Sequence, residues 1–491
     1  MFVRGLAITL ALLLYIGFVI LSLSTRVPTP TRSNYTAAAK QYLVKHSKLP
    51  WANGVAPIKE SFAGLVGIRF VATFFVANAS LFFWFFPSLT QTQTQTQTGP
   101  EDDPAPLIVW LQGGPGSSSM IGLFYEMGPL RVNNDLTLTR NNWTWNEKAS
   151  MLFIDNPAGV GYSKVSPTSQ STPSFSATSG PSYKNGYVTN QAAVGRDLVL
   201  FLEEFYKLFP AQRKAKLYLT GESYAGKYIP SFANAIIEHN KNMSEKDETN
   251  DDFRLKQYFF PLNGIAIGNG LTDPASQVLA HAPLALALGL VSKKQSEVLN
   301  SYAQDSVQKA SKGQWREATL ARNEIFAKFK EFSGNINPYD VRKGSVQNSW
   351  VDMETLLNID TVKKALNVPT VYKFEKDPKV AEAMFEDGMK SSKGVVSETA
   401  ESLKVLLYQG QFDYRDGILS CNDWISQLEW TGQKDYSEAP RNIWKIGNTT
   451  VGYVTEHKHL RRVEVLHAGH LSPKDAPEAT REMIYELIGL N

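Results

Sequence analysis

The sequence predicts an α/β fold, in which a mostly parallel sheet is covered by helices on both faces. Short, uniformly apolar runs lie between turn signals, which is typical of strands buried on both faces. Amphipathic segments of helical period, such as 192–208 and 229–238, separate several of these runs. Six runs are expected as strands of the sheet: 107–111, 150–155, 216–220, 264–270, 405–413 and 463–466.

The composition excludes several classes of protein. The chain has 491 residues, 43% of them apolar and 20% charged, with a net charge of +3. These are globular values, so disordered, collagen-like and coiled-coil proteins are excluded. Because the charges are interspersed and form no basic stripe, we expect no nucleic-acid partner. The single cysteine, Cys421, allows neither an intrachain disulfide nor a cysteine-based zinc site, and it is expected to be a buried apolar filler.

The N-terminus carries a segment for membrane targeting. Residues 5–24 are apolar or weakly polar, and twenty such residues can cross a bilayer, so residues 1–25 are expected to be a signal peptide or a signal anchor. The positive charges that follow favour a cytoplasmic body, whereas five N-x-[S/T] sequons favour the secretory pathway. We expect the secretory pathway, with a lysosomal, vacuolar or secreted protein that residues 5–24 can anchor to a membrane. The candidate glycosylation sites are Asn34, Asn78, Asn142, Asn242 and Asn448.

The rest of the chain divides by composition. Residues 26–59 are expected to be a linker or N-terminal segment, and 60–274 and 350–491 form the two parts of the α/β core. Between them, 275–349 is charged, helix-rich and without strand signals, which predicts a helical insertion. A strand-rich pair of runs occupies 71–86, and the low-complexity tract QTQTQTQT (91–98) is expected to enlarge a hairpin loop.

The sharpest local signal is the segment 221–226, Gly-Glu-Ser-Tyr-Ala-Gly. It follows an expected strand and opens a helical pattern, as the turn that exposes a nucleophilic serine does. Small residues on both sides of Ser223 relieve the crowding of that turn. The alternative is an ordinary strand-to-helix turn without catalytic function.

A nucleophilic serine needs a histidine base and a carboxylate to orient that base. Among seven histidines, His470 follows an expected strand and is flanked by Gly469, with His467 as its nearest rival. Asp413 ends another strand, where the carboxyl edge of a sheet binds ligands, and Asp416 is a weaker rival because it lies further into the loop. The order serine, aspartate, histidine along the chain is the order found in α/β-hydrolases.

Catalysis by serine also needs backbone N–H donors for the negative charge that develops on the substrate oxygen. The segment Gln112–Gly116 (QGGPG) follows an expected strand, and its glycines allow the backbone to approach a substrate closely. The amides of Gly114 and of Tyr224, the residue after the nucleophile, are therefore the expected oxyanion donors.

These motifs together resemble the serine carboxypeptidase family, and the QGGPG variant with LFFWFFP most resembles its vitellogenic-like branch. The resemblance runs from about residue 60 onward, in family order. It implies an α/β-hydrolase fold, a triad of Ser223, Asp413 and His470, and no metal or organic cofactor. The motifs that carry it are WLQGGPGSSS (110–119), FIDNPAGVGYS (153–163), TGESYAGKYIP (220–230), NGIAIGNGLTDP (263–274), GQFD (410–413) and AGHLSPKDAP (468–477).

The resemblance also implies how the free C-terminal carboxylate of a peptide is held. The matching positions are Gln112, Glu126, Glu222 and the amide of Gly113. Two acidic side chains accept a carboxylate only if protons are shared among them, because like charges raise one another's pKa. Activity is therefore expected to be favoured at mildly acidic pH. Without the resemblance, Glu126 and Glu222 would be interpreted as a structural hydrogen-bonded pair.

Four positions depart from the family pattern. Gln112 replaces the usual Asn, Ser117 stands where many members have a disulfide cysteine, and Leu471-Ser472 replaces Met-Val after the histidine. The sequence thus predicts a serine carboxypeptidase acting on peptides or proteins with a free C-terminus. The alternatives are an acyltransferase or esterase using the same acyl-enzyme, and a non-catalytic scaffold or partner protein; the sequence leaves the oligomeric state open.

Overall fold

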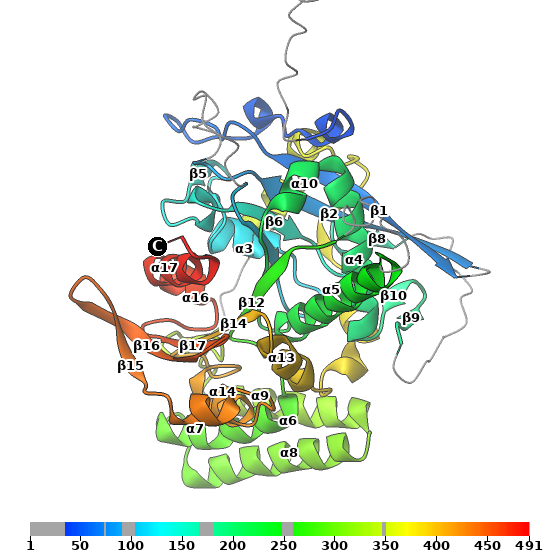
Figure 1. The fold of residues 1–491 in the computed structure, drawn as a ribbon. Helices are drawn as coiled ribbons and strands as arrows, with labels where there is room; N and C mark the ends of the chain where they lie inside the picture. Colours follow the sequence, from blue (N-terminus) through cyan, green and yellow to red (C-terminus); the bar gives the residue numbers. More distant parts are fainter. Residues whose placement is uncertain are drawn as a thin grey trace, which may run out of the picture.

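The computed structural model describes residues 35–72, 75–90, 104–165, 180–247, 259–345 and 350–490. Its centre is an eleven-stranded sheet with the order β1-β2-β6-β3-β11-β12-β14-β17-β16-β15, to which β8 adds by pairing with β2 (Figure 1). The strands are β1 (Phe62–Ala72), β2 (Phe75–Phe86), β3 (Leu107–Leu111), β6 (Ser150–Ile154), β8 (Lys164–Val165), β11 (Leu217–Glu222), β12 (Leu262–Gly268), β14 (Lys404–Gly410), β15 (Asn442–Ile446), β16 (Thr449–His457) and β17 (Leu460–Val465).

The six middle strands are parallel, and antiparallel strands extend the sheet at both edges. β3 pairs in parallel with β6 and β11, and β12 with β11 and β14, which also pairs with β17. At the edges, β2 is antiparallel to its neighbours β1 and β6, and β16 is antiparallel to its neighbours β15 and β17. These six parallel strands are the six apolar runs of the sequence, so the predicted mostly parallel α/β sheet is confirmed.

The two faces of the sheet carry separate hydrophobic cores. Along β3, Leu107, Val109 and Leu111 belong to one core, and Ile108 and Trp110 belong to the other. This alternation is the period of two that a strand imposes on its side chains. The first core is covered by α4 (Gln191–Leu208), α5 (Ala225–Asp247), α13 (Lys393–Ala400) and α14 (Ile418–Ser426), and the second by α3 (Met120–Tyr125), α10 (Val351–Asn358), α11 (Asp360–Ala365) and α17 (Pro477–Ile488).

The chain between β12 and β14 is mostly helical. The expected insertion contains α6 (Pro274–Gln277), α7 (His281–Ala287), α8 (Lys293–Ser311) and α9 (Trp315–Ser333). In Figure 1, α8 and α9 lie side by side at the bottom of the view, and they share a third hydrophobic cluster with Met389 and Tyr414. Helical structure continues beyond residue 349, but α10 and α11 pack in the second core of the sheet rather than with α8 and α9.

Two parts of the N-terminal half differ from expectation. The Gln-Thr tract joins β2 to β3, which do not pair because β6 lies between them, so the predicted hairpin loop at this tract is wrong; β1 and β2 form the hairpin instead. Residues 35–59 contain two 3₁₀ turns, η1 (Ala38–Tyr42) and η2 (His46–Lys48), and bury Val44, Leu49 and Ile58 against the second core. Apolar side chains spaced among its polar residues explain why this segment packs on the domain.

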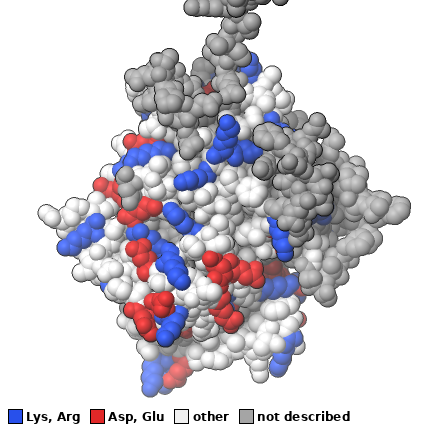
Figure 2. Space-filling model, viewed as in Figure 1, with Lys and Arg blue, Asp and Glu red and all other residues white. Residues whose placement is uncertain are grey.

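The surface and the targeting segment add two observations. On the face shown in Figure 2, basic and acidic side chains are interspersed over the described surface. Residues 5–24 and the Gln-Thr tract lie outside the described residues. No helix in the described ranges is long and apolar enough to cross a membrane.

Candidate active site

Ser223 lies in the tight turn between β11 and α5. Its φ is +62°, a left-handed conformation that is unfavourable for a residue with a side chain. Hydrogen bonds hold it there: the Ser223 amide donates to the carbonyl of Gly268 at 3.0 Å, and the Ser223 carbonyl accepts from the amides of Gly226 and Leu271, each at 2.9 Å. The turn leaves the serine half-buried while its neighbours Glu222 and Tyr224 are buried.

Small residues are required around this turn. A Cβ atom at Gly221 would lie 2.5 Å from the carbonyl oxygen of Leu111, and one at Gly226 would lie 2.8 Å from the amide nitrogen of Leu271. Both contacts are with backbone, which cannot move aside as a flexible side chain does. Close packing against the backbone therefore requires glycine at both positions, in addition to the conformation of the turn.

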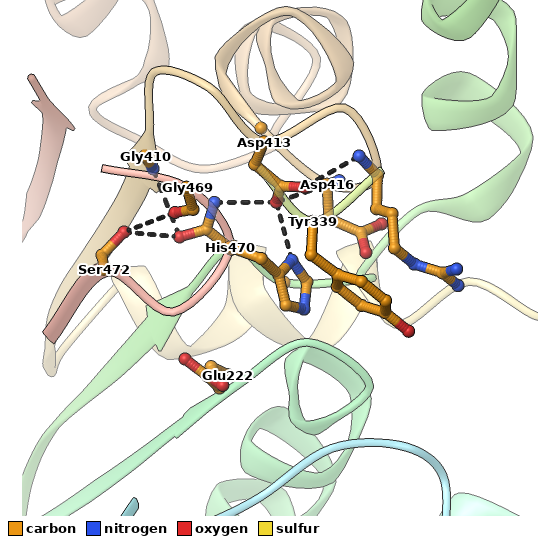
Figure 3. Close-up of polar contacts among 12 residues, drawn as sticks. Glu222, Tyr339, Gly410, Asp413, Asp416, Gly469, His470 and Ser472 are labelled. Atoms are coloured by element: carbon orange, nitrogen blue, oxygen red, sulfur yellow. Dashed lines mark hydrogen bonds and ion pairs between the residues drawn. The ribbon is translucent and has the colours of Figure 1, made fainter. Parts of the chain in front are cut away.

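Asp413 and His470 come together at the carboxyl end of the sheet. Asp413 follows β14 and His470 follows β17, and His470 Nδ1 lies 2.7 Å from Asp413 Oδ2 (Figure 3). Both side chains are buried. Burial alone would lower the pKa of His470, but the charge of Asp413 and its hydrogen bond outweigh burial, so the pKa is raised above the ordinary value. His470 Nε2 is buried and has no hydrogen-bond partner in the described part of the chain.

Three further donors hold the Asp413 carboxylate. Asn269 Nδ2 donates to Oδ2 at 2.8 Å, the amide of Arg415 donates to Oδ1 at 2.8 Å, and the amide of Asp416 donates to Oδ2 at 3.2 Å. Asn269 directly follows β12 and has a φ of +42°, a conformation that asparagine tolerates better than most residues. Hydrogen bonds to the ionised form favour a carboxylate, which is the form that stabilises a protonated histidine.

The Asn269 side chain also joins this carboxylate to the loop of His470. Ser472 Oγ donates to Asn269 Oδ1 at 2.8 Å, and the amide of Gly410 donates to the same oxygen at 3.2 Å. These two donors fix which end of the amide faces Asp413. Figure 3 shows this network beside the aromatic ring of Tyr339, which lies 5.1 Å from the His470 ring.

Sequence reasoning missed Asn269, although it examined the motif that contains it. The signal was an asparagine directly after an apolar strand at the carboxyl edge of the sheet. Asn269 follows a strand at the carboxyl edge of the sheet, as Asp413 does. Because its amide carries no charge, it was not considered a catalytic candidate. Ser472 was noted only as a departure from the family pattern.

The rival residues lie elsewhere. His467 is exposed, and its backbone carbonyl accepts from Arg342 at 2.9 Å. The side chain of Asp416 is buried and accepts from Gln277 at 3.3 Å, with Arg322 at 4.0 Å. Neither side chain makes a hydrogen bond to His470 among the described residues, so the structure brings Asp413 rather than Asp416 to the histidine.

The expected oxyanion donors lie on two loops that touch. A Cβ atom at Gly113 would lie 2.5 Å from the amide nitrogen of Tyr224 and 2.7 Å from Ser223 Cβ, so this glycine backbone lies directly against the nucleophile turn. Within the described residues, neither the amide of Gly114 nor that of Tyr224 donates to another group. The Tyr224 side chain is anchored by a 2.6 Å hydrogen bond to Asp387, which also pairs with buried Lys227 at 2.7 Å.

The residues expected to hold a carboxylate form a buried cluster beside Ser223. Gln112 Nε2 donates to Glu222 Oε1 at 2.6 Å, and Gln112 Oε1 accepts from Trp110 at 3.0 Å, which fixes the amide orientation. Glu126 is fully buried where α3 ends. Both oxygens of Glu126 and Oε2 of Glu222 have no hydrogen-bond donor in the described part of the chain.

The electrostatics of Glu126 and Glu222 favour a shared proton. Burial raises the pKa of Glu126 to about 7. Burial, then the charge of Glu126, raises the pKa of Glu222 well above its ordinary value. Two ionised carboxylates have no hydrogen to share, so a proton on one of them is what allows a hydrogen bond between them.

The structure also places the cysteine, Ser117 and the candidate glycosylation sites. Cys421 is buried in the first core, and burial raises the pKa of its thiol to about 12, as befits an apolar filler. Ser117 is half-buried. Among the sequons, Asn142, Asn242 and Asn448 are exposed. Asn34 lies outside the described residues.

Comparison with known proteins identifies the family. The family model described as serine carboxypeptidase matches residues 60–489. The chain belongs to the serine carboxypeptidase family. It is 34% identical over 422 residues to the probable serine carboxypeptidase CPVL of Dictyostelium discoideum, covering 84% of this chain and 76% of that protein. It is 31% identical over 417 residues to the venom serine carboxypeptidase of Apis mellifera, covering 83% and 80%.

A solved structure agrees with the sequence comparison. The crystal structure of Kex1Δp, a prohormone-processing carboxypeptidase from Saccharomyces cerevisiae, matches with a TM-score of 0.76 and 26% identity, covering 92% of this chain and 96% of that one. The predicted α/β-hydrolase fold and serine carboxypeptidase family, with its vitellogenic-like branch, are confirmed. This serine carboxypeptidase is therefore a hydrolase.

Proposed function

We propose that this chain removes single residues from the C-termini of peptides through an acyl-enzyme on Ser223. His470 Nε2 takes the Ser223 proton as the hydroxyl oxygen attacks the last peptide carbonyl. Asp413 orients His470 and stabilises the imidazolium, while the amides of Gly114 and Tyr224 receive the oxyanion. His470 then gives the proton to the departing amino acid. Water, activated by the same histidine, hydrolyses the ester and restores Ser223.

The substrate's free carboxylate would lie against Gln112, the Gly113 amide, Glu126 and Glu222. The observation that carries this proposal is the set of three carboxyl oxygens without a donor, buried next to the nucleophile turn. A protonated pair can donate to a substrate carboxylate, whereas two ionised carboxylates would repel it. An enzyme without a charged leaving residue has no need of this cluster, which favours peptide hydrolysis over ester hydrolysis or acyl transfer.

The Glu126–Glu222 carboxyl pair and the histidine base set opposite requirements on pH. His470 must be neutral to accept the serine proton, so activity falls as the pH drops below its raised pKa. The carboxyl pair must hold a proton, so binding of a carboxylate weakens once the pH rises above the raised pKa values of both Glu126 and Glu222. Peptide hydrolysis is therefore expected to decline on the alkaline side of neutrality.

We also propose that the chain works in the secretory pathway, in a lysosome or vacuole or outside the cell. One relative is named a venom enzyme, three sequons have exposed asparagines, and residues 5–24 suit a signal peptide or anchor. Peptides or proteins with a free C-terminus are the proposed substrates.

The test is release of free amino acids from N-blocked dipeptides by the wild type and Ser223→Ala. The proposal expects release by the wild type, none by the variant, and none from the same dipeptide with an amidated C-terminus. Labelling of Ser223 by a fluorophosphonate reports an activated serine independently of substrate. Labelling without release would indicate an acyltransferase or esterase, and the absence of both would indicate a non-catalytic scaffold; either result contradicts the proposal.

A further inference from the structure

The side chain of Tyr224, the residue after the nucleophile, ends on a buried ion pair. Its hydroxyl donates to Asp387 Oδ2 at 2.6 Å, and Lys227 Nζ lies 2.7 Å from the same oxygen. Gln191 Nε2 also donates to that oxygen, at 2.7 Å, and Lys227 donates to the backbone carbonyl of Asp387 as well. The side-chain exposure is 0% for Lys227 and 2% for Asp387. Because hydrogen bonds to an ionised group are stronger than those between neutral groups, the Tyr224 hydroxyl is firmly held.

Asp387 comes from a different part of the chain than the turn it contacts. It ends the 3₁₀ turn η8 (Phe385–Asp387), whereas its three donors lie at the N-terminal ends of α4 and α5. The helical insertion supports η8 from another direction. Thr319 Oγ1 on α9 donates to the carbonyl of Phe385 at 3.2 Å, and the Arg316 guanidinium lies 5.2 Å from the Phe385 ring. Asp387 is therefore fixed between α9 and the two helices that cover the first core.

The peptide group between Ser223 and Tyr224 carries one of the expected oxyanion donors. Its carbonyl accepts from the amides of Gly226 and Leu271, and the Tyr224 amide donates to no group among the described residues. Ser223 has a φ of +62°, and a residue in such a conformation keeps it only where surrounding contacts hold it. The Tyr224 side chain supplies such a contact, because relaxation of the turn would move its Cα atom and break the bond to Asp387.

We propose that Asp387, fixed by Lys227, is a positioning residue that holds the Tyr224 amide at the oxyanion site. The inference rests on the proposed function, because that function makes this amide an oxyanion donor. Asp387 acts through the Tyr224 hydroxyl and leaves the backbone amide free for the substrate oxygen. The alternative is a buried ion pair that serves only the stability of the fold.

Tyr224→Phe removes the hydroxyl and leaves the ion pair intact. It is expected to lower kcat about tenfold for an N-blocked dipeptide and for the p-nitrophenyl ester of an N-blocked amino acid. The loss is smaller than the roughly 100-fold cost of deleting an oxyanion donor, since the amide is displaced rather than removed. Rates are taken per active site titrated with a fluorophosphonate, so a loss of folded protein does not count as a loss of rate.

Two inhibitors separate the oxyanion site from the rest of the pocket. A peptide aldehyde forms a tetrahedral adduct with serine, whose oxygen takes the oxyanion position, so Tyr224→Phe should bind it about tenfold more weakly. The released free amino acid binds at the carboxylate site, so its inhibition constant should not change. The control is Tyr206→Phe on α4, whose hydroxyl is buried without a partner in the described part of the chain. Its kcat and both inhibition constants should equal those of the wild type.

A double-mutant cycle tests whether Asp387 acts through Tyr224. Removing one charge of a buried pair leaves the other uncompensated, so Asp387→Leu and Lys227→Met are made together. This pair of substitutions should lower kcat about tenfold in the wild type and not at all in a chain that already carries Tyr224→Phe. The matched control is Asp305→Leu with Lys309→Met, which removes a partly exposed ion pair on α8 and should leave kcat unchanged.

The outcomes separate this proposal from the proposed function. If the wild type releases no amino acid from the dipeptides, the proposed function fails. If the wild type is active and Tyr224→Phe keeps its kcat and its affinity for the aldehyde, only the role of Asp387 is overturned. An equal loss of kcat from the pair substitution with and without Tyr224→Phe also overturns it, because the pair would then act by another route. Should the pair substitution prevent folding, the kinetics of Tyr224→Phe still decide.

Discussion

Asn269 Nδ2 donates a 2.8 Å hydrogen bond to Oδ2 of Asp413, the same oxygen that lies 2.7 Å from His470 Nδ1. The amide is itself held by Ser472 Oγ at 2.8 Å. The aspartate is thus fixed between the strand end that carries Asn269 and the loop that carries His470. A carboxylate with several fixed donors can orient a histidine precisely without moving during the reaction.

Replacing Asn269 by alanine is expected to lower kcat by about 10- to 100-fold, because a hydrogen bond to a charged group contributes about 1.5–3 kcal/mol. The effect should be the same for peptide and ester substrates, since both need the triad, and KM should change little. Steady-state kinetics on both substrates test this. Ser472→Ala removes only the hydrogen bond that supports the Asn269 amide, so it should lower kcat less. An unchanged kcat in Asn269→Ala would contradict the assigned role.

Replacing Gly113 by alanine is expected to reduce kcat at least about 100-fold, the usual cost of losing one oxyanion donor. The added Cβ would lie 2.5 Å from the Tyr224 amide nitrogen, so the two loops must separate. Fluorophosphonate labelling of Ser223 should slow in parallel. The control is Gly394→Ala, where a Cβ meets no atom within 4 Å. Normal kinetics in Gly113→Ala would show that the donors lie elsewhere.

Replacing Glu222 by glutamine is expected to change how stability depends on pH. The folded state holds the Glu222 proton more tightly than the unfolded chain, whose pKa is near 4.5. As the pH rises above 4.5, the unfolded state releases its proton first, so this group increasingly disfavours folding. Glu222→Gln should therefore gain stability relative to the wild type between pH 5 and pH 8, measured by urea unfolding. If the free energies of unfolding of the wild type and of Glu222→Gln changed with pH in parallel, the raised pKa of Glu222 would be contradicted.

Glycosylation is expected at Asn142, Asn242 and Asn448, whose side chains are exposed. After expression in secreting eukaryotic cells, peptide N-glycosidase should lower the apparent mass of the protein. Single Asn→Gln variants should each remove part of that shift. A mass unaffected by the glycosidase would contradict the proposed passage through the secretory pathway.

The sheet was largely predictable because its strands are buried on both faces. LIVWL at 107–111 and VLLY at 405–408 are apolar without interruption, and a parallel strand between two helical layers needs that pattern. The pairing of the strands at the N-terminal edge of the sheet was less predictable. The Gln-Thr tract resembles a long hairpin loop by composition, but whether two strands pair depends on a third, β6, that comes later in the chain.

Candidate site residues could be named from the sequence where a turn carries an unusual combination of residues. Ser223 and His470 were assigned candidate roles because glycines and a strand precede or flank them. Asn269 was not assigned a role, since an amide at a strand end has common structural explanations. Its contacts depend on how β12, β14 and the loop of His470 come together, which the order of residues does not reveal.

The most direct test of the account compares two pH profiles of the wild-type enzyme from pH 4 to 9. One is kcat/KM for an N-blocked dipeptide, and the other is kcat/KM for the p-nitrophenyl ester of the same blocked acyl residue. Both should share the acid limb set by His470, and only the dipeptide should lose activity on the alkaline side as Glu126 and Glu222 ionise. Superimposable profiles for the two substrates would contradict carboxylate binding by a protonated pair.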